Sequence, residues 1–186
     1  SGQIVLDLVQ AGVEVGDDIT VLYSPTRAEQ WFIDSLLKFG SKIRIYPIPM
    51  ERKVGFHDVK DAWKLWQLLR NTGPFEIIHS HSSKAGALAR IAGLFIPLAR
   101  HVYTPHAFFT MAPGTSPVYG WVEFFLSFFC SAIVCVSDQE KRHAQKDLKI
   151  PTCKLFVVPN GVVLDYPATR VDARISMQAK ETDFIV

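Results

Sequence analysis

The sequence predicts an α/β fold in which a parallel sheet is covered by helices on both faces. Segments with helical periodicity alternate with short β-branched segments along nearly the whole chain, and that order is typical of parallel strands joined by helical crossovers. Segments 132–137 and 155–158 are almost continuously apolar, as expected for strands that are covered on both sides. Ligands of such folds bind at the carboxyl ends of the strands, so polar residues that follow strands form the candidate site.

The N-terminal half contains three expected helices and three expected strands. In segment 58–70, Ala62, Leu65 and Leu69 recur at helical spacing, which indicates one apolar helix face. Pro47 restricts its strand to an edge position. The expected helices are 4–15, 29–39 and 58–70, and the expected strands are 18–24, 42–48 and 75–80.

The C-terminal half repeats this alternation. Pro105 ends one strand, and segment 109–117, with two prolines and a glycine, is an expected loop. The chain begins with a helical pattern and stops within the strand-like segment 181–186, so we expect a strand upstream and a longer parent protein. The expected helices are 84–96, 118–130 and 138–148, and the expected strands are 100–107, 132–137 and 154–162.

Length and composition favour one ordinary globular domain. The chain has 186 residues, of which 48% are hydrophobic and 20% charged, and its formal net charge is +2. So small a charge creates no broad positive field, and we expect no nucleic-acid partner. The three cysteines show no C-x-x-C spacing, which favours free thiols and a reducing, cytoplasmic location.

A metal site is one interpretation of the histidines. His79 and His81 lie two residues apart on an expected strand, so their side chains share one face. Zinc needs a third ligand and usually a fourth. His101 and His106 follow on the next strand, but the sequence contains no H-E-x-x-H or Cys/His spacing. We therefore expect no metal, and we interpret His79 as a buried histidine that donates to a backbone carbonyl.

Common nucleophile and phosphate motifs are absent from the sequence. No G-x-S-x-G elbow surrounds a serine, so a serine hydrolase is disfavoured. Neither the Walker pattern G-x-x-x-x-G-K-[ST] nor the dinucleotide pattern G-x-G-x-x-G occurs. Any phosphate would therefore have to be bound by another device.

The segment HSSKAG, which follows strand 75–80 and opens the next helix, offers such a device. Ser82 or Ser83 is a suitable N-cap, and a helix N-terminus attracts anions. Lys84 adds a full positive charge, which is unfavourable at an empty helix N-terminus but favourable beside a phosphate or an acidic sugar. The alternative is a lysine that points into solvent.

Two further polar residues follow strands. His106 comes just after Pro105, where its imidazole can hydrogen-bond a hydroxyl or act as a general acid or base. The alternative is a loop histidine that caps the backbone. Ser137 and Glu140 have the spacing of a capping box, which gives Glu140 a structural role before any functional one.

Helix 118–130 carries apolar side chains over about 200° of its circumference. The apolar run is too short to span a bilayer and contains Glu123. We expect one side to pack on the sheet. The excess apolar arc around Trp121 can extend the core, or contact a partner, a missing domain or a lipid surface.

Four segments, in this order and spacing, resemble the N-terminal domain of family-4 glycosyltransferases. They cover most of 75–167, and the opening segment 1–24 is similar to the family's glycine loop, first helix and second strand. The likeness is greatest to bacterial enzymes that assemble capsule, exopolysaccharide or O-antigen. The four segments are EIIHSHSSKAGALARIAG, HVYTPHAFF, WVEFFLSFFCSAIVCVSDQEK and LFVVPNGVVLDYP.

The resemblance implies a GT-B enzyme, in which two Rossmann-like domains face each other across a cleft. The N-terminal domain, here 1–167, holds a glycan or lipid-linked acceptor. The C-terminal domain, whose linker and first strand would be 168–186, holds the nucleotide-sugar donor. The residues that match the family's catalytic and substrate-binding positions are His106 as the catalytic residue, and Gly2, His81, Ser82, Ser83, Lys84, Glu140 and Asn160 as substrate-binding residues.

Two departures from the family limit what the resemblance implies. The family's opening loop has paired glycines, and this chain has only Gly2. The donor-binding half is expected beyond Val186, so we expect that the chain alone does not transfer sugar. For the whole enzyme the resemblance implies transfer with retention, without cofactor or metal, in the cytoplasm and at the inner face of the membrane if the aromatic helix contacts lipid. A sugar-nucleotide epimerase and a non-catalytic glycan- or phosphate-binding module stay open as alternatives.

Overall fold

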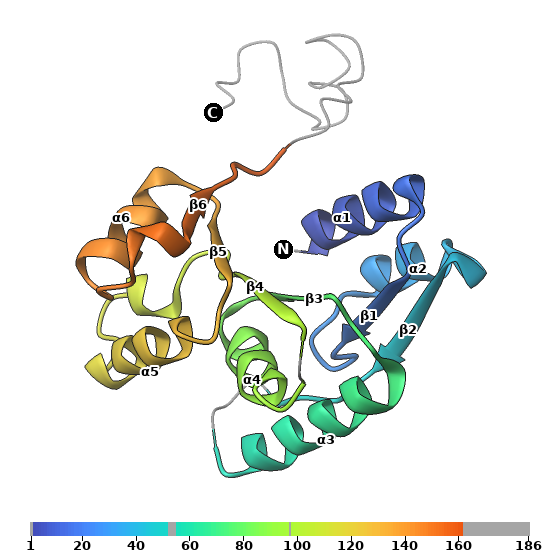
Figure 1. Cartoon of the computed structure of the whole chain (residues 1–186), viewed down its shortest axis with the longest axis horizontal. Coiled ribbons are helices and arrows are strands. Elements are labelled where there is room, and N and C mark those ends of the chain that lie inside the picture. Colours follow the sequence, from blue (N-terminus) through green and yellow to red (C-terminus); the bar gives the residue numbers. More distant parts are fainter. Residues whose placement is uncertain (1, 52–54, 97, 162–186) are drawn as a thin grey trace, which may run out of the picture.

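The computed structural model describes residues 2–51, 55–96 and 98–161. Helices and strands alternate through these residues, as the sequence predicts, and helices flank the sheets (Figure 1). The helices are α1 (Gly2–Val15), α2 (Gln30–Leu37), α3 (His57–Thr72), α4 (Ser83–Gly93), α5 (Pro117–Ser127) and α6 (Asp138–Lys146). Short 3₁₀ turns are η1 (Gly40–Lys42), η2 (Phe109–Met111) and η3 (Thr152–Lys154).

The strands form two parallel sheets within the described residues. They are β1 (Ile19–Tyr23), β2 (Ile43–Pro47), β3 (Ile77–His81), β4 (Arg100–Thr104), β5 (Ala132–Cys135) and β6 (Leu155–Val157). One sheet has the order β1-β2, and the other has the order β3-β4-β5-β6. The sequence predicted parallel pairing but not this division. The upstream strand and the predicted segment 168–186 lie outside the described residues.

Three apolar clusters hold these layers together. The first joins β4, β5, β6 and α6, where Tyr103, Ile133 and Cys135 are fully buried. The second packs α3 against α4, and the third packs α1 and α2 on β1 and β2. Cys130 and Cys135 are buried free thiols, as the sequence predicted.

Helix α4 lies unusually close to β4, which explains its run of small residues. A Cβ atom at Gly86 would lie 2.3 Å from Cε2 of Tyr103, and one at Gly93 would lie 1.7 Å from Cε1 of His101. Real Cβ atoms never approach other atoms so closely. The absence of side chains at these two positions therefore lets the helix backbone pack directly on the rings of Tyr103 and His101.

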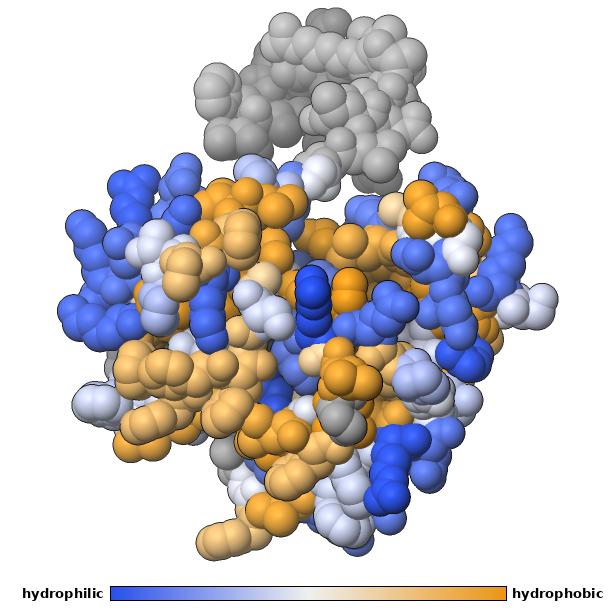
Figure 2. Space-filling view, in the orientation of Figure 1, coloured by the Kyte–Doolittle hydropathy of each residue, from blue (hydrophilic) through white to orange (hydrophobic). Residues whose placement is uncertain are grey.

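Helix α5 buries its polar side and exposes its aromatic side, which the sequence pattern did not predict. Glu123, Leu126 and Ser127 are buried. Arg90 on α4 explains this orientation, because its buried guanidinium donates to Glu123 Oε2 at 2.9 Å. The aromatic face, as we call it, has side chains that are each at least 40% exposed: Val118, Trp121, Val122, Phe125, Phe128 and Phe129. These apolar atoms form a continuous area over α5, at the lower left of Figure 2.

Candidate functional site

Three histidines meet where β3 and β4 end. Because the strands are parallel and in register, with His81 opposite Thr104, their carboxyl ends lie at one edge of the sheet. The rings of His79 and His81 lie 4.2 Å apart between centroids. His106, just past β4, stacks on His81 at 5.3 Å with an interplanar angle of 20°. We call His79, His81 and His106 the histidine array.

Hydrogen bonds fix the array at both ends. His81 Nδ1 and His106 Nε2 are 3.1 Å apart, and His79 Nε2 lies 2.8 Å from Oγ1 of Thr104. The prediction that His79 is buried and donates to a backbone carbonyl is therefore wrong. Counted over the whole residue His79 is exposed, although neighbouring groups shield part of its ring, and its partner is a hydroxyl group rather than a backbone carbonyl.

The array is neutral at pH 7. Desolvation by burial, together with the neighbouring rings, lowers the pKa of His79 to about 4 and the pKa of His81 to about 3. Burial also lowers the pKa of His106 below its usual value. A neutral imidazole has one donor and one acceptor nitrogen. His106 can therefore exchange a proton or a hydrogen bond with a hydroxyl at the nitrogen that does not face His81.

Ser82 and Ser83 differ in what they bond. Ser82 occupies the N-cap of α4 with a left-handed φ of 69°, but its side chain makes no capping hydrogen bond. Its backbone N–H donates to the carbonyl of Thr104 at 3.0 Å. Ser83 Oγ accepts from the N–H of Phe109 at 3.2 Å. The predicted side-chain cap is thus wrong, and both serines instead tie the start of α4 to β4 and its following loop.

Lys84 is paired with a carboxylate. Its Nζ lies 2.7 Å from Oδ1 of Asp58, in the first turn of α3, and both side chains are largely buried. Burial would raise the pKa of Asp58, but the hydrogen bonds from Lys84 and from the N–H of Gly55 outweigh it and lower the pKa. The alternative interpretation, in which Lys84 points into solvent, is therefore wrong. Binding of a ligand anion by Lys84 stays a prediction and would have to compete with Asp58.

Glu140 is buried and supports the loop that carries His106. It is 1% exposed. One carboxylate oxygen accepts from the N–H of Ala107 at 2.7 Å, and the other accepts from the N–H of Val136 at 2.6 Å. Ser137 Oγ accepts from the N–H of Glu140, so half of the predicted capping box is present. The carboxylate itself reaches across to the β4 loop instead of back to Ser137.

The structure gives Gly2 a packing role and leaves Asn160 exposed. Gly2 begins α1, where a Cβ atom would lie 3.2 Å from the ring of Trp31 and 3.3 Å from that of Phe32. Close packing therefore accounts for this glycine. Asn160 is exposed beyond the end of β6, at the carboxyl edge of the sheet. Contacts of either residue with a substrate stay predictions.

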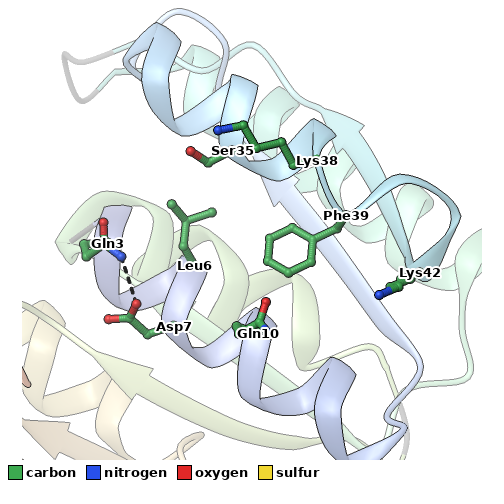
Figure 3. A pocket seen from close by; sticks show the side chains of 8 residues that line it. All are labelled: Gln3, Leu6, Asp7, Gln10, Ser35, Lys38, Phe39 and Lys42. Atoms are coloured by element: carbon green, nitrogen blue, oxygen red, sulfur yellow. Dashed lines mark hydrogen bonds between the residues drawn. The ribbon is translucent and has the colours of Figure 1, made fainter. Parts of the chain in front are cut away.

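One open hollow lies between α1 and the end of α2 (Figure 3). All the residues that line it come before the histidine array in the sequence. Its volume is about 400 Å³. Gln3 donates to Asp7 at 2.8 Å on one wall, and Lys38 projects from the other. No member of the histidine array lines it. The lining residues are Gln3, Leu6, Asp7, Gln10, Ser35, Lys38, Phe39 and Lys42.

A second hollow, of about 360 Å³, lies between η2 and α6 and contains a hydrogen-bonded chain that the sequence did not suggest. Thr110 Oγ1 is 2.8 Å from His143 Nε2, and His143 Nδ1 is 2.8 Å from Asp147 Oδ2. The connectivity is that of a hydroxyl–His–Asp triad. The N–H groups of Met111 and Ala112 next to Thr110, however, donate to carbonyls of their own turn. They cannot stabilise an oxyanion, so the chain of bonds orders η2 against α6.

Neither a metal-binding cluster nor a membrane-spanning helix occurs in residues 2–51, 55–96 and 98–161. No group of three or more His, Cys, Asp or Glu side chains in that part of the chain is arranged to hold a metal ion. None of the helices there is both long enough and apolar enough to cross a bilayer.

Parallel sheets with polar side chains gathered at the carboxyl ends of their strands define the class of α/β proteins that bind ligands at this edge. The profile of Glycosyltransferase Family 4 matches residues 1–166. The chain therefore belongs to this family of sugar-transferring enzymes, and the resemblance seen in the sequence is confirmed.

Individual relatives agree with this assignment. The chain is 33% identical over 111 residues to an Escherichia coli UDP-Gal:alpha-D-GlcNAc-diphosphoundecaprenol alpha-1,3-galactosyltransferase, a match that covers 58% of this chain and 28% of the relative. A crystal structure of a glycosyltransferase from Rickettsia africae has a TM-score of 0.68 at 15% identity, over 97% of this chain and 46% of that one. Anabaena Alr3699/HepE in complex with UDP has a TM-score of 0.64 at 18% identity, over 92% and 44%.

These relatives are longer than this chain, which spans less than half of each one's length. At such low identity the two structural matches establish the fold alone. The fold confirms the GT-B type α/β arrangement that the resemblance implied.

Proposed function

We propose that this chain is the acceptor-side domain of a glycosyltransferase that moves a sugar from a nucleotide-diphosphate donor to a glycan or lipid-linked acceptor. The observation that carries the proposal is the position of His106. It lies past the carboxyl end of β4, neutral and hydrogen-bonded to His81. The E. coli relative by its name uses UDP-Gal and a diphosphoundecaprenol acceptor, and Anabaena Alr3699/HepE binds UDP and glucose. Both support nucleotide-sugar chemistry.

The proposed chemistry divides between two domains. His106 hydrogen-bonds the donor sugar, and the exposed part of the histidine array with the HSSK turn forms the acceptor wall. Charge that develops on the leaving diphosphate is stabilised by basic groups and a helix N-terminus of the donor domain, without a metal. The anomeric configuration is retained. Because the donor domain is needed to complete this site, the 186-residue chain alone transfers no sugar.

Sugar transfer by the full-length protein tests the proposal. Release of UDP from UDP-sugars that depends on a GlcNAc-diphosphate lipid, with an α-linked product seen by NMR, is the expected result. Acceptor-independent epimerisation of the donor would identify an epimerase instead. Binding of glycans without any turnover would identify a binding module. The isolated chain should show no turnover, and measurable turnover would contradict the two-domain division.

We further propose that the aromatic face of α5 lies on a lipid surface. A helix that turns Glu123 inward and Trp121 outward has its apolar moment directed away from the core, contrary to an ordinary surface helix. Lys154 donates to the carbonyls of Ser127 and Phe128 at the end of α5 and lies 5.9 Å from the ring centroid of Phe128, so a cation borders the apolar area, as in interfacial helices. The lipid-linked acceptor named for the E. coli relative supports this occupant over a protein.

Flotation with liposomes that contain anionic phospholipid tests this contact. The double change Phe125→Ser and Phe129→Ser should reduce the bound fraction severalfold, because it removes apolar area from the contact. Trp63→Ser on α3, which also alters an exposed aromatic residue, is the matched control and should bind normally. Equal flotation of all three proteins would contradict the proposal.

A further inference from the structure

The turn that presents His106 has an unfavourable backbone. His106 has a φ of 52° and Ala107 a φ of 72°. Non-glycine residues seldom occupy this left-handed region, and two in succession persist only where the surroundings hold them. The residues on either side supply part of that support, because Pro105 and Phe108 are almost fully buried.

Glu140 supplies the specific contact to this turn. The N–H of Ala107, at the second left-handed residue, donates to its buried carboxylate at 2.7 Å. The other oxygen is held by the N–H of Val136 at the end of β5. One side chain at the start of α6 therefore joins the β5–α6 turn to the β4 loop. Hydrogen bonds to a carboxylate are stronger than those between neutral groups.

The ring of His106 is held separately from its backbone. Nδ1 of His81, at the end of β3, lies at hydrogen-bond distance, 3.1 Å, from Nε2 of His106. With the backbone held by Glu140 and one nitrogen held by His81, the imidazole has a single orientation, and Nδ1 is the nitrogen left for a substrate. Both contacts are made by residues of this chain, so the arrangement needs no ligand to form.

We propose that Glu140 is a positioning residue for His106, acting through the N–H of Ala107 rather than by touching substrate. The catalytic consequence rests on the proposed function. The positioning itself does not, because it concerns the geometry of the turn in the free protein. This role replaces the substrate contact that the family resemblance implied for Glu140.

Imidazole ¹⁵N NMR of the 186-residue chain tests the positioning directly. Glu140→Gln puts an NH₂ group against one of the two backbone N–H donors, so one hydrogen bond is lost. We expect the His106 ring signals to shift and broaden, and its pKa to rise toward 6.5 as the ring becomes hydrated. His57, at the start of α3 and outside the histidine array, serves as an internal reference, and its signals should not change.

Ser137→Ala is the matched control. It removes the bond to the N–H of Glu140 but leaves both carboxylate contacts, so the His106 signals should stay as in the wild type. If Glu140→Gln does not fold, Glu140→Asp, which is one methylene shorter, carries the same comparison. A folded Glu140 variant with unchanged His106 signals and pKa would overturn the proposal.

In the full-length enzyme, Glu140→Gln should lower kcat roughly tenfold or more, since misplacing a reacting group by about 1 Å has effects of this size, with little change in the KM of the donor. If the full-length protein transfers no sugar but the NMR response is seen, only the proposed function fails. If transfer occurs and both kcat and the His106 signals are unaffected by the change, the positioning role fails.

Discussion

Arg90 shows how a single buried charge can decide the orientation of a helix. Its side chain is fully buried, donates to Glu123 and to the carbonyl of Gly86, and lies over the ring of Tyr103 at 4.0 Å. A buried guanidinium needs a partner, so α5 must turn Glu123 inward. Hydropathy patterns cannot predict this, because they score Glu123 as a surface residue.

The ion pair predicts strongly non-additive effects on stability. Glu123→Leu leaves the guanidinium without its anion and should cost about 3–5 kcal/mol. The double change Arg90→Leu and Glu123→Leu should cost less than the sum of the single changes. Urea denaturation measures all three variants. Additive losses in the free energy of unfolding would show that the pair is not coupled.

The histidine array predicts a dependence of stability on pH. The folded pKa values of His79 and His81 lie below the unfolded value near 6.5, so the unfolded chain binds protons first as the pH falls. Their contribution is therefore complete above pH 6.5 and decreases toward pH 4, by at most about 1.4 kcal/mol per pH unit for the half-buried His81 and by less for the more exposed His79, which solvent screens. Thermal unfolding from pH 7.5 to 4.5 should follow this slope, and His81→Asn should reduce it. An identical slope in the variant would contradict the assignment.

At the scale of elements, the glycines of α4 determine how closely it packs on β4. Gly86→Ala would force a Cβ into the ring of Tyr103, whose hydroxyl also donates to Glu123. We expect a loss of about 1–3 kcal/mol or more. Gly120→Ala on α5 is the matched control, since its Cβ would meet Leu148 at an ordinary 3.5 Å.

The control change, Gly120→Ala, should raise the free energy of unfolding, whereas Gly86→Ala should lower it. Alanine is favoured over glycine inside a helix by about 0.5–1 kcal/mol, so Gly120→Ala should stabilise the protein slightly. Chemical denaturation of both variants measures the contrast. A Gly86→Ala variant as stable as the wild type would show that α4 can move away from β4 at no cost.

The elements themselves were predictable from sequence, but their exposed faces were not. Periodicity located each described helix and strand, because local patterns of apolar residues record local structure. The aromatic face of α5 was expected to be at least partly covered, and it is exposed because Arg90 fixes the opposite side. The chain Thr110–His143–Asp147 was missed because Thr110 lies 33 residues before His143, although His143 and Asp147 are only one helical turn apart.

At the scale of the whole molecule, the sequence predicted that candidate residues gather at one edge of the sheet, but not the hydrogen bonds that they make there. Parallel strands bring their carboxyl ends to one edge by topology alone, which places His81 and His106 together. The roles of Lys84 and Glu140 required three-dimensional contacts, since Asp58 and Ala107 are distant in the chain. The division into two sheets likewise depends on pairing that periodicity does not encode.

The molecule presents its histidine array at the surface and not within either of the two hollows described above. That arrangement suits the proposed role of this chain as one wall of a site that a second domain completes. We therefore expect His106 to be essential for the proposed transfer in the full-length enzyme.

Steady-state transfer by the full-length protein with His106→Ala is the most direct test of this central claim. His106→Ala should lower kcat about 10²–10⁴-fold, the range expected for loss of a positioned acid–base or hydrogen-bonding group, with the fold intact by circular dichroism. His143→Ala, a histidine outside the array, should retain activity close to that of the wild type. Transfer by the His106→Ala enzyme at the wild-type rate would contradict the account.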